Sequence, residues 1–125
     1  SHGLGHLWRA LLEAYGYALA HHVEVLNDMG HATERYFASD GGASSLVWMQ
    51  IVADILQKPV QLLEGHPGSC LGAAWTAAIG AGLAEDWGGI GGFVGLGRLV
   101  EPNPAHAEIY RDGYARYRDL YRRLA

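Results

Sequence analysis

One short segment, residues 39–45, has residue types and spacing that suit the binding of a ligand. Its sequence is Ser-Asp-Gly-Gly-Ala-Ser-Ser, and it falls between a predicted strand and a predicted helix. Gly41 and Gly42 lack the β-carbons that would keep a ligand away from the backbone. The start of the next helix supplies free N–H groups and the positive end of a helix dipole. The segment is therefore a candidate site for an adenosine or phosphate group, and an ordinary tight turn at the two glycines is the alternative.

The common glycine-rich nucleotide motifs do not account for this segment. A P-loop is excluded because no Gly-Lys followed by Ser or Thr stands at the right spacing, and the dinucleotide-binding fingerprint is also missing. The position of the segment favours a ligand instead. It follows the carboxyl end of a predicted strand, which is the edge where open α/β sheets place ligands.

No metal site is expected from the seven histidines. His2 and His6 are four residues apart near the terminus, and His21 and His22 are adjacent, so these two point in different directions on a helix. Neither pair has an obvious third ligand, which favours structural or surface histidines over a zinc site. Five carboxylates are interpreted as solvated or capping groups: Asp28, Asp54, Glu64, Glu85 and Asp86.

The composition limits the classes of function. A chain of 125 residues that is 50% hydrophobic suits one domain with its own core. The net charge of -4 argues against a nucleic-acid partner, because phosphate binding needs a basic surface.

Cys70 is the only cysteine, which excludes an internal disulfide and favours a reducing compartment, so a cytoplasmic protein is expected. Residues 68–84 are slightly short for a membrane span, so a tightly packed buried helix and no membrane partner are predicted.

The hydrophobic pattern predicts a βαβ unit behind a long helix. Apolar residues at steps of three and four predict this helix over residues 4–29, ended by Gly30. Strands are predicted at residues 35–39 and 60–63. The helix between them begins at Ser44 or Ser45 and ends at Lys58. Two such strands should be parallel, with a right-handed crossover.

Two more helices are predicted in the second half of the chain. One starts at His66-Pro67 and runs to about residue 83, and the other starts at Asn103-Pro104 and carries a stripe rich in tyrosine. Residues 87–97 are rich in glycine and predicted to be irregular. Because a sheet of two strands is too small to be covered on both faces, the chain looks like a piece of something larger.

Four blocks of the sequence resemble the FGGY family of carbohydrate kinases. Residues 40–50, Asp-Gly-Gly-Ala-Ser-Ser-Leu-Val-Trp-Met-Gln, resemble the family signature, roughly Gly-Gly-Gly-Ala-Lys-Ser-x-Leu-Trp-x-Gln. Residues 51–60 resemble its continuation, a helix that leads into Pro-Val. Glu64 with residues 68–74 resembles the Glu…Gly-Ala-Leu-Gly-Ala-Ala segment, and the tyrosine-rich helix resembles the last helix of the family. The blocks cover nearly the whole chain in the right order, and the subfamily that they resemble is xylulokinase-like.

This resemblance implies a fold and a reaction. The fold is α/β: part of a ribonuclease H/actin-like ATPase domain, with a βαβ core and long flanking helices. Residues 1–125 would be the C-terminal part of the second of two domains, and the N-terminal domain would be absent. Members of the family transfer the γ-phosphoryl group of Mg-ATP to a sugar hydroxyl. The resemblance thus implies ATP and Mg²⁺ as cofactors of the full-length enzyme, with xylulose or a related ketose or polyol as substrate.

The resemblance also assigns residues to the nucleotide site. They are Gly41, Gly42, Ala43, Ser44 and Ser45. The glycines and Ala43 would form a backbone platform, and Ser45 falls where the family often has a polar residue near the adenine. Ser44 replaces a frequent lysine, which leaves open how phosphates are contacted from this side, while Asp40 in place of the first glycine does not affect the assignment. No catalytic residue is assigned, because the base aspartate belongs to the absent domain, and the chain alone is expected to be inactive.

Two other functions stay open beside that of a partial kinase. One is a non-catalytic nucleotide-binding module with the same fold, and the other is an oligomerisation module whose helices form a subunit interface. A chain that lacks sheet partners should expose apolar surface, which tends to drive association. A homo-oligomer is therefore expected.

Overall fold

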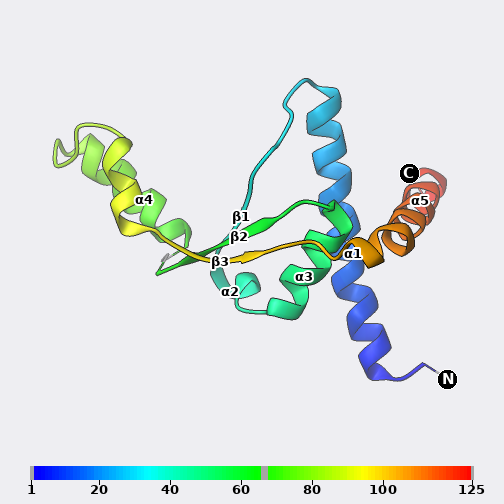
Figure 1. Cartoon of the computed structure of the whole chain (residues 1–125). Coiled ribbons are helices and arrows are strands. Elements are labelled where there is room, and N and C mark those ends of the chain that lie inside the picture. The colour runs from blue at the N-terminus through cyan, green and yellow to red at the C-terminus, as the bar shows by residue number, and fades with distance from the viewer. Residues whose placement is uncertain (1, 66–67, 125) are drawn as a thin grey trace.

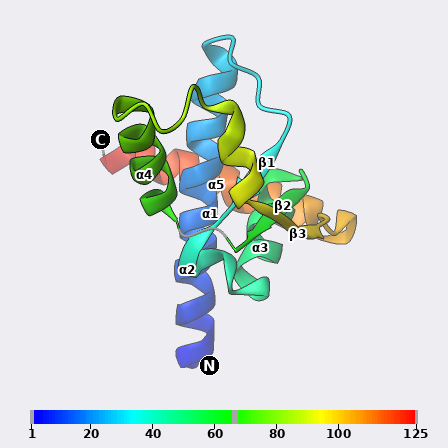
Figure 2. The ribbon, with the colours of Figure 1, turned by 90° about the vertical axis from the view of Figure 1, so that its left-hand side faces the viewer.

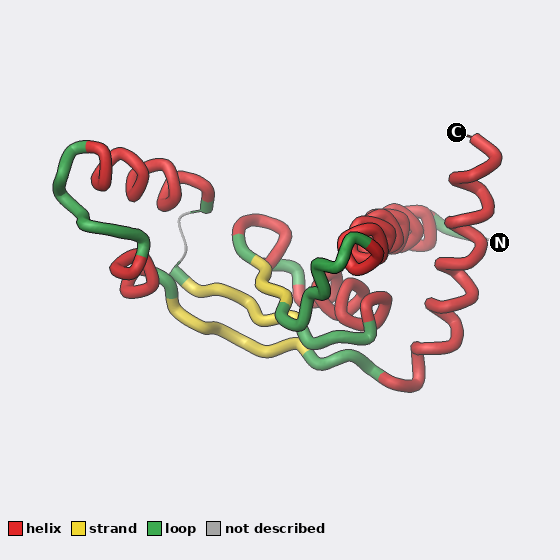
Figure 3. The backbone as a smooth tube through the Cα atoms, turned by 90° about the horizontal axis from the view of Figure 1, so that it is seen from above, coloured by secondary structure: helices red, strands yellow, loops and turns green. Residues whose placement is uncertain are grey.

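The computed structural model of the protein describes residues 2–65 and 68–124. A small sheet lies at the centre of the molecule, with helices α1 and α5 on one side and α4 at the opposite end (Figure 1). The view from above shows the same arrangement (Figure 3). The predicted helix start at His66-Pro67 lies outside the described residues.

The longest element is α1, which spans Leu4–Asp28. It ends in a Schellman motif: the N–H of Gly30 donates to the Asn27 carbonyl at 2.9 Å, and the N–H of His31 donates to the Leu26 carbonyl at 2.9 Å. Gly30 has a φ of +85°, a left-handed conformation that glycine adopts at little cost. The predicted end of the helix at this glycine is confirmed.

Three strands form one sheet in the order β1-β2-β3. Strands β1 (Tyr36–Ala38) and β2 (Val60–Glu64) are parallel, which confirms the predicted βαβ unit. Strand β3 (Gly95–Val100) lies antiparallel along the other side of β2.

The prediction of an irregular segment over residues 87–97 was wrong in its last part. Gly88–Phe93 is a 3₁₀ helix, and β3 begins directly after it. Gly95 and Gly97 hid the strand, because glycine is depleted in strands and breaks their alternating pattern. A β-carbon at Gly97 would stand 2.6 Å from Glu64 Cγ, so any larger residue there would force the Glu64 side chain to move.

Helix α3 (Leu46–Leu56) connects the two parallel strands and covers the sheet. Ser45 caps it, since its Oγ accepts from the Trp48 N–H at 3.3 Å, as the sequence predicts. A single helical turn, α2 (Asp40–Ala43), precedes it where only a tight turn is predicted. The core lies between α3 and the sheet and includes Met49, Val52, Ala53, Val60, Leu62 and Val100.

The last two helices lie at opposite ends of the molecule. Helix α4 spans Ser69–Gly80 and carries the buried Leu71. The chain then returns through β3 to a 3₁₀ turn, Pro104–His106, and α5, which spans Ala107–Leu124. Asn103 Oδ1 accepts from the Ala105 N–H at 3.0 Å, which confirms the predicted cap.

Helix α5 packs against α1 through aromatic side chains. Tyr17 of α1 meets Tyr110, Tyr114 and Tyr117, with ring centroids 6.1 to 6.4 Å apart. Burial raises the pKa of Tyr17 to about 12, so its hydroxyl stays neutral at physiological pH. In contrast, Trp8 of the same helix α1 is 64% exposed. Over the described residues, every helix is too short or too polar to cross a bilayer.

Candidate functional site

The turn at residues 39–45 stands where the sequence predicts it, at the carboxyl end of β1. Because β1 and β2 are parallel neighbours, the chain segments that leave them emerge at the same edge of the sheet. Helix α3 begins directly behind the turn, and its first N–H groups point out of the helix start. The structure therefore joins a strand end and a helix start in the predicted way.

The two glycines of the turn have different surroundings. A β-carbon at Gly41 would meet no atom within 4 Å, so the backbone there is uncovered. A β-carbon at Gly42 would stand 3.0 Å from the Trp48 indole. Gly42 thus packs closely against Trp48, and Gly41 is the position where a ligand can approach the backbone.

The other three residues assigned to this site also include both packed and exposed ones. Ala43 is half-buried and packs against the core cluster. The Oγ of Ser45 already accepts the capping hydrogen bond from Trp48. Ser44 is exposed, and its N–H donates to the Gly41 carbonyl at 3.3 Å. Of the five assigned residues, Gly41 and Ser44 are therefore the exposed ones.

Asp40 connects this turn to the start of α4. It has a φ of +68°, a left-handed conformation that costs a residue with a β-carbon about 1 kcal/mol. Its carboxylate lies against Gly68, where a β-carbon would overlap Oδ1 of Asp40. Gly68 is itself left-handed, with a φ of +66°. No local sequence pattern indicates this contact, because the two residues follow different strands.

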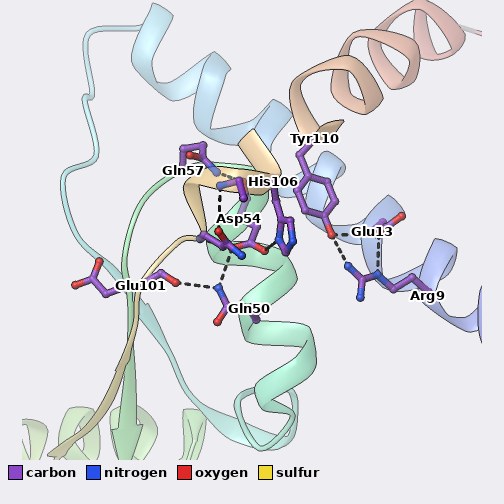
Figure 4. Close-up of polar contacts among 10 residues, drawn as sticks. Arg9, Glu13, Gln50, Asp54, Gln57, Glu101, His106 and Tyr110 are labelled. Atoms are coloured by element: carbon purple, nitrogen blue, oxygen red, sulfur yellow. Dashed lines mark hydrogen bonds and ion pairs between the residues drawn. The ribbon is translucent and has the colours of Figure 1, made fainter. Parts of the chain in front are cut away.

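A second polar cluster surrounds Asp54, which is only 2% exposed (Figure 4). Its Oδ1 accepts from the Asn103 N–H at 2.7 Å and from Gln50 Nε2 at 2.8 Å, and its Oδ2 lies 2.7 Å from His106 Nδ1. The prediction of a solvated or capping carboxylate was wrong for Asp54. It is a buried acceptor that fixes the start of the last helix against α3.

The charge state of Asp54 follows from these contacts. Burial alone would raise its pKa. The hydrogen bonds from Asn103, His106 and Gln50 outweigh burial and hold the pKa below its ordinary value. Asp54 is therefore ionised at neutral pH, and both of its oxygens are engaged by structural partners, which argues against a role as a catalytic base.

A third polar group joins α1 to α5 (Figure 4). Arg9 Nε donates to Glu13 Oε1 at 2.8 Å, and Arg9 Nη2 donates to the Tyr110 hydroxyl at 2.6 Å. Tyr110 also donates to Glu13 Oε1 at 3.2 Å. The three side chains form hydrogen bonds with one another, so this cluster is a structural contact between α1 and α5.

The described residues offer room for part of an adenine nucleotide but no cluster of ligands for Mg²⁺. The uncovered backbone at Gly41 leaves room for part of a nucleotide. Among residues 2–65 and 68–124 no three His, Cys, Asp or Glu side chains gather as metal ligands. A magnesium ion that accompanies a nucleotide usually takes only one or two carboxylates besides phosphate oxygens and waters, so this finding assigns no magnesium ligand in the chain.

Comparison with known proteins gives the family. Residues 1–81 match the FGGY family of carbohydrate kinases, C-terminal domain. The solved structure of xylulose kinase from Rhodospirillum rubrum is 54% identical, with a TM-score of 0.83 over 99% of this chain and 25% of that one. The corresponding kinase from Brucella ovis is 29% identical, with a TM-score of 0.81 over 99% of this chain and 26% of that one. The chain belongs to the FGGY family and has part of its actin-like ATPase fold, as the sequence predicts.

Curated relatives agree with these structures. A xylulose kinase from Staphylococcus epidermidis is 29% identical over 115 residues, which are 91% of this chain and 23% of that protein. An autoinducer-2 kinase from Enterobacter sp. (strain 638) is 32% identical over 117 residues, 92% of this chain and 22% of that protein. The chain thus spans about a quarter of the length of the proteins that it matches.

Proposed function

We propose that this chain is the nucleotide-binding part of a sugar kinase that uses Mg-ATP. Relatives named xylulose kinase and autoinducer-2 kinase support phosphoryl transfer to a hydroxyl of a small polyhydroxylated substrate. The proposed substrate is xylulose or a related ketose or polyol, since two solved xylulose kinases share the fold of nearly the whole chain.

One observation carries the proposal: the uncovered backbone of Gly41 at the carboxyl edge of the parallel strand pair. In the proposed complex Gly41 and Ser44 form the exposed platform beside the nucleotide. Gly42, Ala43 and Ser45 hold that platform in place through Trp48, the core and the cap of α3. Their role is to position the nucleotide rather than to take part in bond making.

Phosphoryl transfer depends on positioning and on electrostatic stabilisation of the transferred group. When bound, Mg-ATP supplies the phosphoryl group and the charge that neutralises its oxygens. This chain supplies one wall of the binding cleft. Both oxygens of the Asp54 carboxylate are already engaged, so Asp54 is not the proposed base for the sugar hydroxyl. The proposal places that base in the rest of the protein. The chain alone is thus expected to lack kinase activity.

The test is a coupled assay of ADP release by the full-length protein with a panel of ketoses and polyols. We expect ADP release that requires a sugar and is highest with xylulose or a close relative. ATP binding without phosphorylation of any sugar would instead indicate a non-catalytic nucleotide-binding module. Failure to bind ATP would contradict both functions.

A further inference from the structure

A cavity of about 480 Å³ lies where α1, α3 and α5 meet. Its walls come from the C-terminal half of α1, the end of α3 and the first half of α5, which crosses α1 in the view of Figure 2. The turn at residues 39–45 precedes the other end of α3. Because a helix rises about 1.5 Å per residue, the 11 residues of α3 put roughly 16 Å between that turn and the cavity. The cavity is therefore separate from the proposed nucleotide platform.

The floor of the cavity is the apolar surface of Val23, Ile55 and Tyr110. Val23 and Ile55 are half-buried, and Tyr110 is buried. The Tyr110 hydroxyl is already bonded to Arg9 and Glu13, so Tyr110 offers the cavity its ring. An apolar floor beneath a few polar groups, in a cavity of some hundreds of Å³, is typical of sites for small molecules.

The rim of the cavity carries hydrogen-bonding groups that the fold does not use. Arg111 and Asp28 are exposed, and within the described chain neither side chain has a hydrogen bond or an ion pair. Glu24 Oε2 accepts from the Tyr114 hydroxyl and from Arg118, whereas its Oε1 has no partner among the described residues. The hydrogen bond from Tyr114 holds the pKa of Glu24 below its ordinary value, so Glu24 is ionised at neutral pH. A guanidinium and two carboxylates are therefore available to a ligand.

The charges around the cavity favour one class of ligand. Glu24, Asp28 and the C-terminal ends of α1 and α3, where the helix dipoles are negative, disfavour an anion. Arg111 disfavours a cation. A hydroxyl group both donates and accepts, so it pairs with a carboxylate as well as with a guanidinium, and it carries no charge that must lose its water. The C–H surface of a sugar also suits the apolar floor.

We propose that this cavity is a binding site for a small neutral polyhydroxylated ligand, a sugar or a sugar alcohol. In the bound state Asp28 and Glu24 Oε1 accept from its hydroxyl groups, and Arg111 donates to them. The carbon skeleton of the ligand covers Val23 and Ile55. The proposed kinase function is not needed for this site, because no residue of the turn at 39–45 lines the cavity.

Alanine methyl signals in the NMR spectrum of the full-length protein report on this cavity without any variant. Ala20 and Ala107 line it, while Ala77 belongs to α4 at the opposite end of the chain that the structure describes (Figure 1). In a titration with xylitol we expect the signals of Ala20 and Ala107 to shift until they saturate, and that of Ala77 to stay in place. Unshifted Ala20 and Ala107 signals would overturn the proposal.

Other probes test the class of ligand at the same two methyl groups. Ribose 5-phosphate is an anion and free serine is a zwitterion, and both carry hydroxyl groups. We expect each to bind more weakly than xylitol, because each must lose water from charged groups. Tighter binding of either one would overturn the assignment of a neutral ligand.

Arg111→Ala tests whether the rim holds the ligand. Arg116→Ala is the matched control, since Arg116 is exposed on the same helix and does not line the cavity. We expect Arg111→Ala to weaken the xylitol binding seen at Ala20 and Ala107 about tenfold or more, because a charged donor is lost, while the control stays within about twofold. Asp28→Ala should weaken it as well, from the opposite wall. Wild-type affinity in Arg111→Ala or in Asp28→Ala would overturn the proposal.

Discussion

His106 Nδ1 lies 2.7 Å from Oδ2 of Asp54, and this contact ties the start of the last helix to the buried face of α3. The two residues are 52 positions apart in the sequence. Asp54 also accepts the backbone N–H of Asn103, so one carboxylate holds the connection from β3 to α5 at two points. The position of α5 against α1 therefore depends on a group that the sequence presents as an ordinary surface carboxylate.

Asp54→Leu should destabilise the protein. The substitution leaves the Asn103 N–H and the Gln50 amide without their buried acceptor, which costs about 1–3 kcal/mol. Glu108→Leu, on the exposed part of α5, is the control and should change the free energy of unfolding by less than about 0.5 kcal/mol. Urea unfolding of the full-length protein measures both. An Asp54→Leu variant as stable as the control would show that the network contributes nothing.

The contribution of Asp54 should depend on pH. Its pKa in the folded protein lies below the unfolded value of about 4, so its stabilising effect is complete above pH 4. The effect is lost as the pH falls through the folded pKa, when the carboxylate takes up a proton. The stability difference between the wild type and Asp54→Asn should therefore shrink below about pH 4. Unfolding curves at pH 7, 4 and 3 check this, and a difference that grows towards acid would contradict the sign of the shift.

Ser45→Ala should weaken the start of α3. Ser45 Oγ accepts the Trp48 N–H, and the loss of such a cap costs about 1 kcal/mol. Ser44→Ala is a matched control, because Ser44 is the exposed neighbour and ends α2 through its backbone N–H alone, which alanine keeps. Thermal unfolding should separate the two variants, with Ser44→Ala close to the wild type. Equal losses for both would mean that the cap is not the cause.

Asp40 and Gly68 should be coupled energetically. Gly68→Ala adds a β-carbon that overlaps the Asp40 carboxylate and strains a left-handed backbone, so it should cost roughly 1–3 kcal/mol. In an Asp40→Gly background the overlap is gone, and the cost should be smaller by at least about 0.5 kcal/mol. Gly72→Ala is the control: it lies in α4 with open space around it, and alanine should be neutral or stabilising there. Additive effects at positions 40 and 68 would contradict the contact.

Local signals made much of the fold predictable. Gly30, Ser45 and Asn103 each end or begin a helix through contacts within a few residues, and all three predictions are confirmed. Strand β3 could not be predicted in this way. Its glycines lie close against Glu64 on the neighbouring strand, and such a cross-strand contact leaves no local pattern.

The site was predictable to a similar extent. The position of the turn after β1 follows from its sequence, whereas the difference between an open Gly41 and a packed Gly42 depends on where the Trp48 ring lies. The role of Asp54 depends on partners about 50 positions away. Nucleotide binding at Gly41, Gly42, Ala43, Ser44 and Ser45 stays a prediction.

Calorimetric titration of the full-length protein with ATP in the presence of Mg²⁺ tests the central claim most directly. Gly41→Val fills the open backbone without touching Trp48, and Gly92→Val adds the same side chain at another open glycine as a control. The account predicts that Gly41→Val weakens ATP binding at least tenfold, while Gly92→Val binds as the wild type does and both variants stay folded. Unchanged ATP affinity in Gly41→Val would contradict the account.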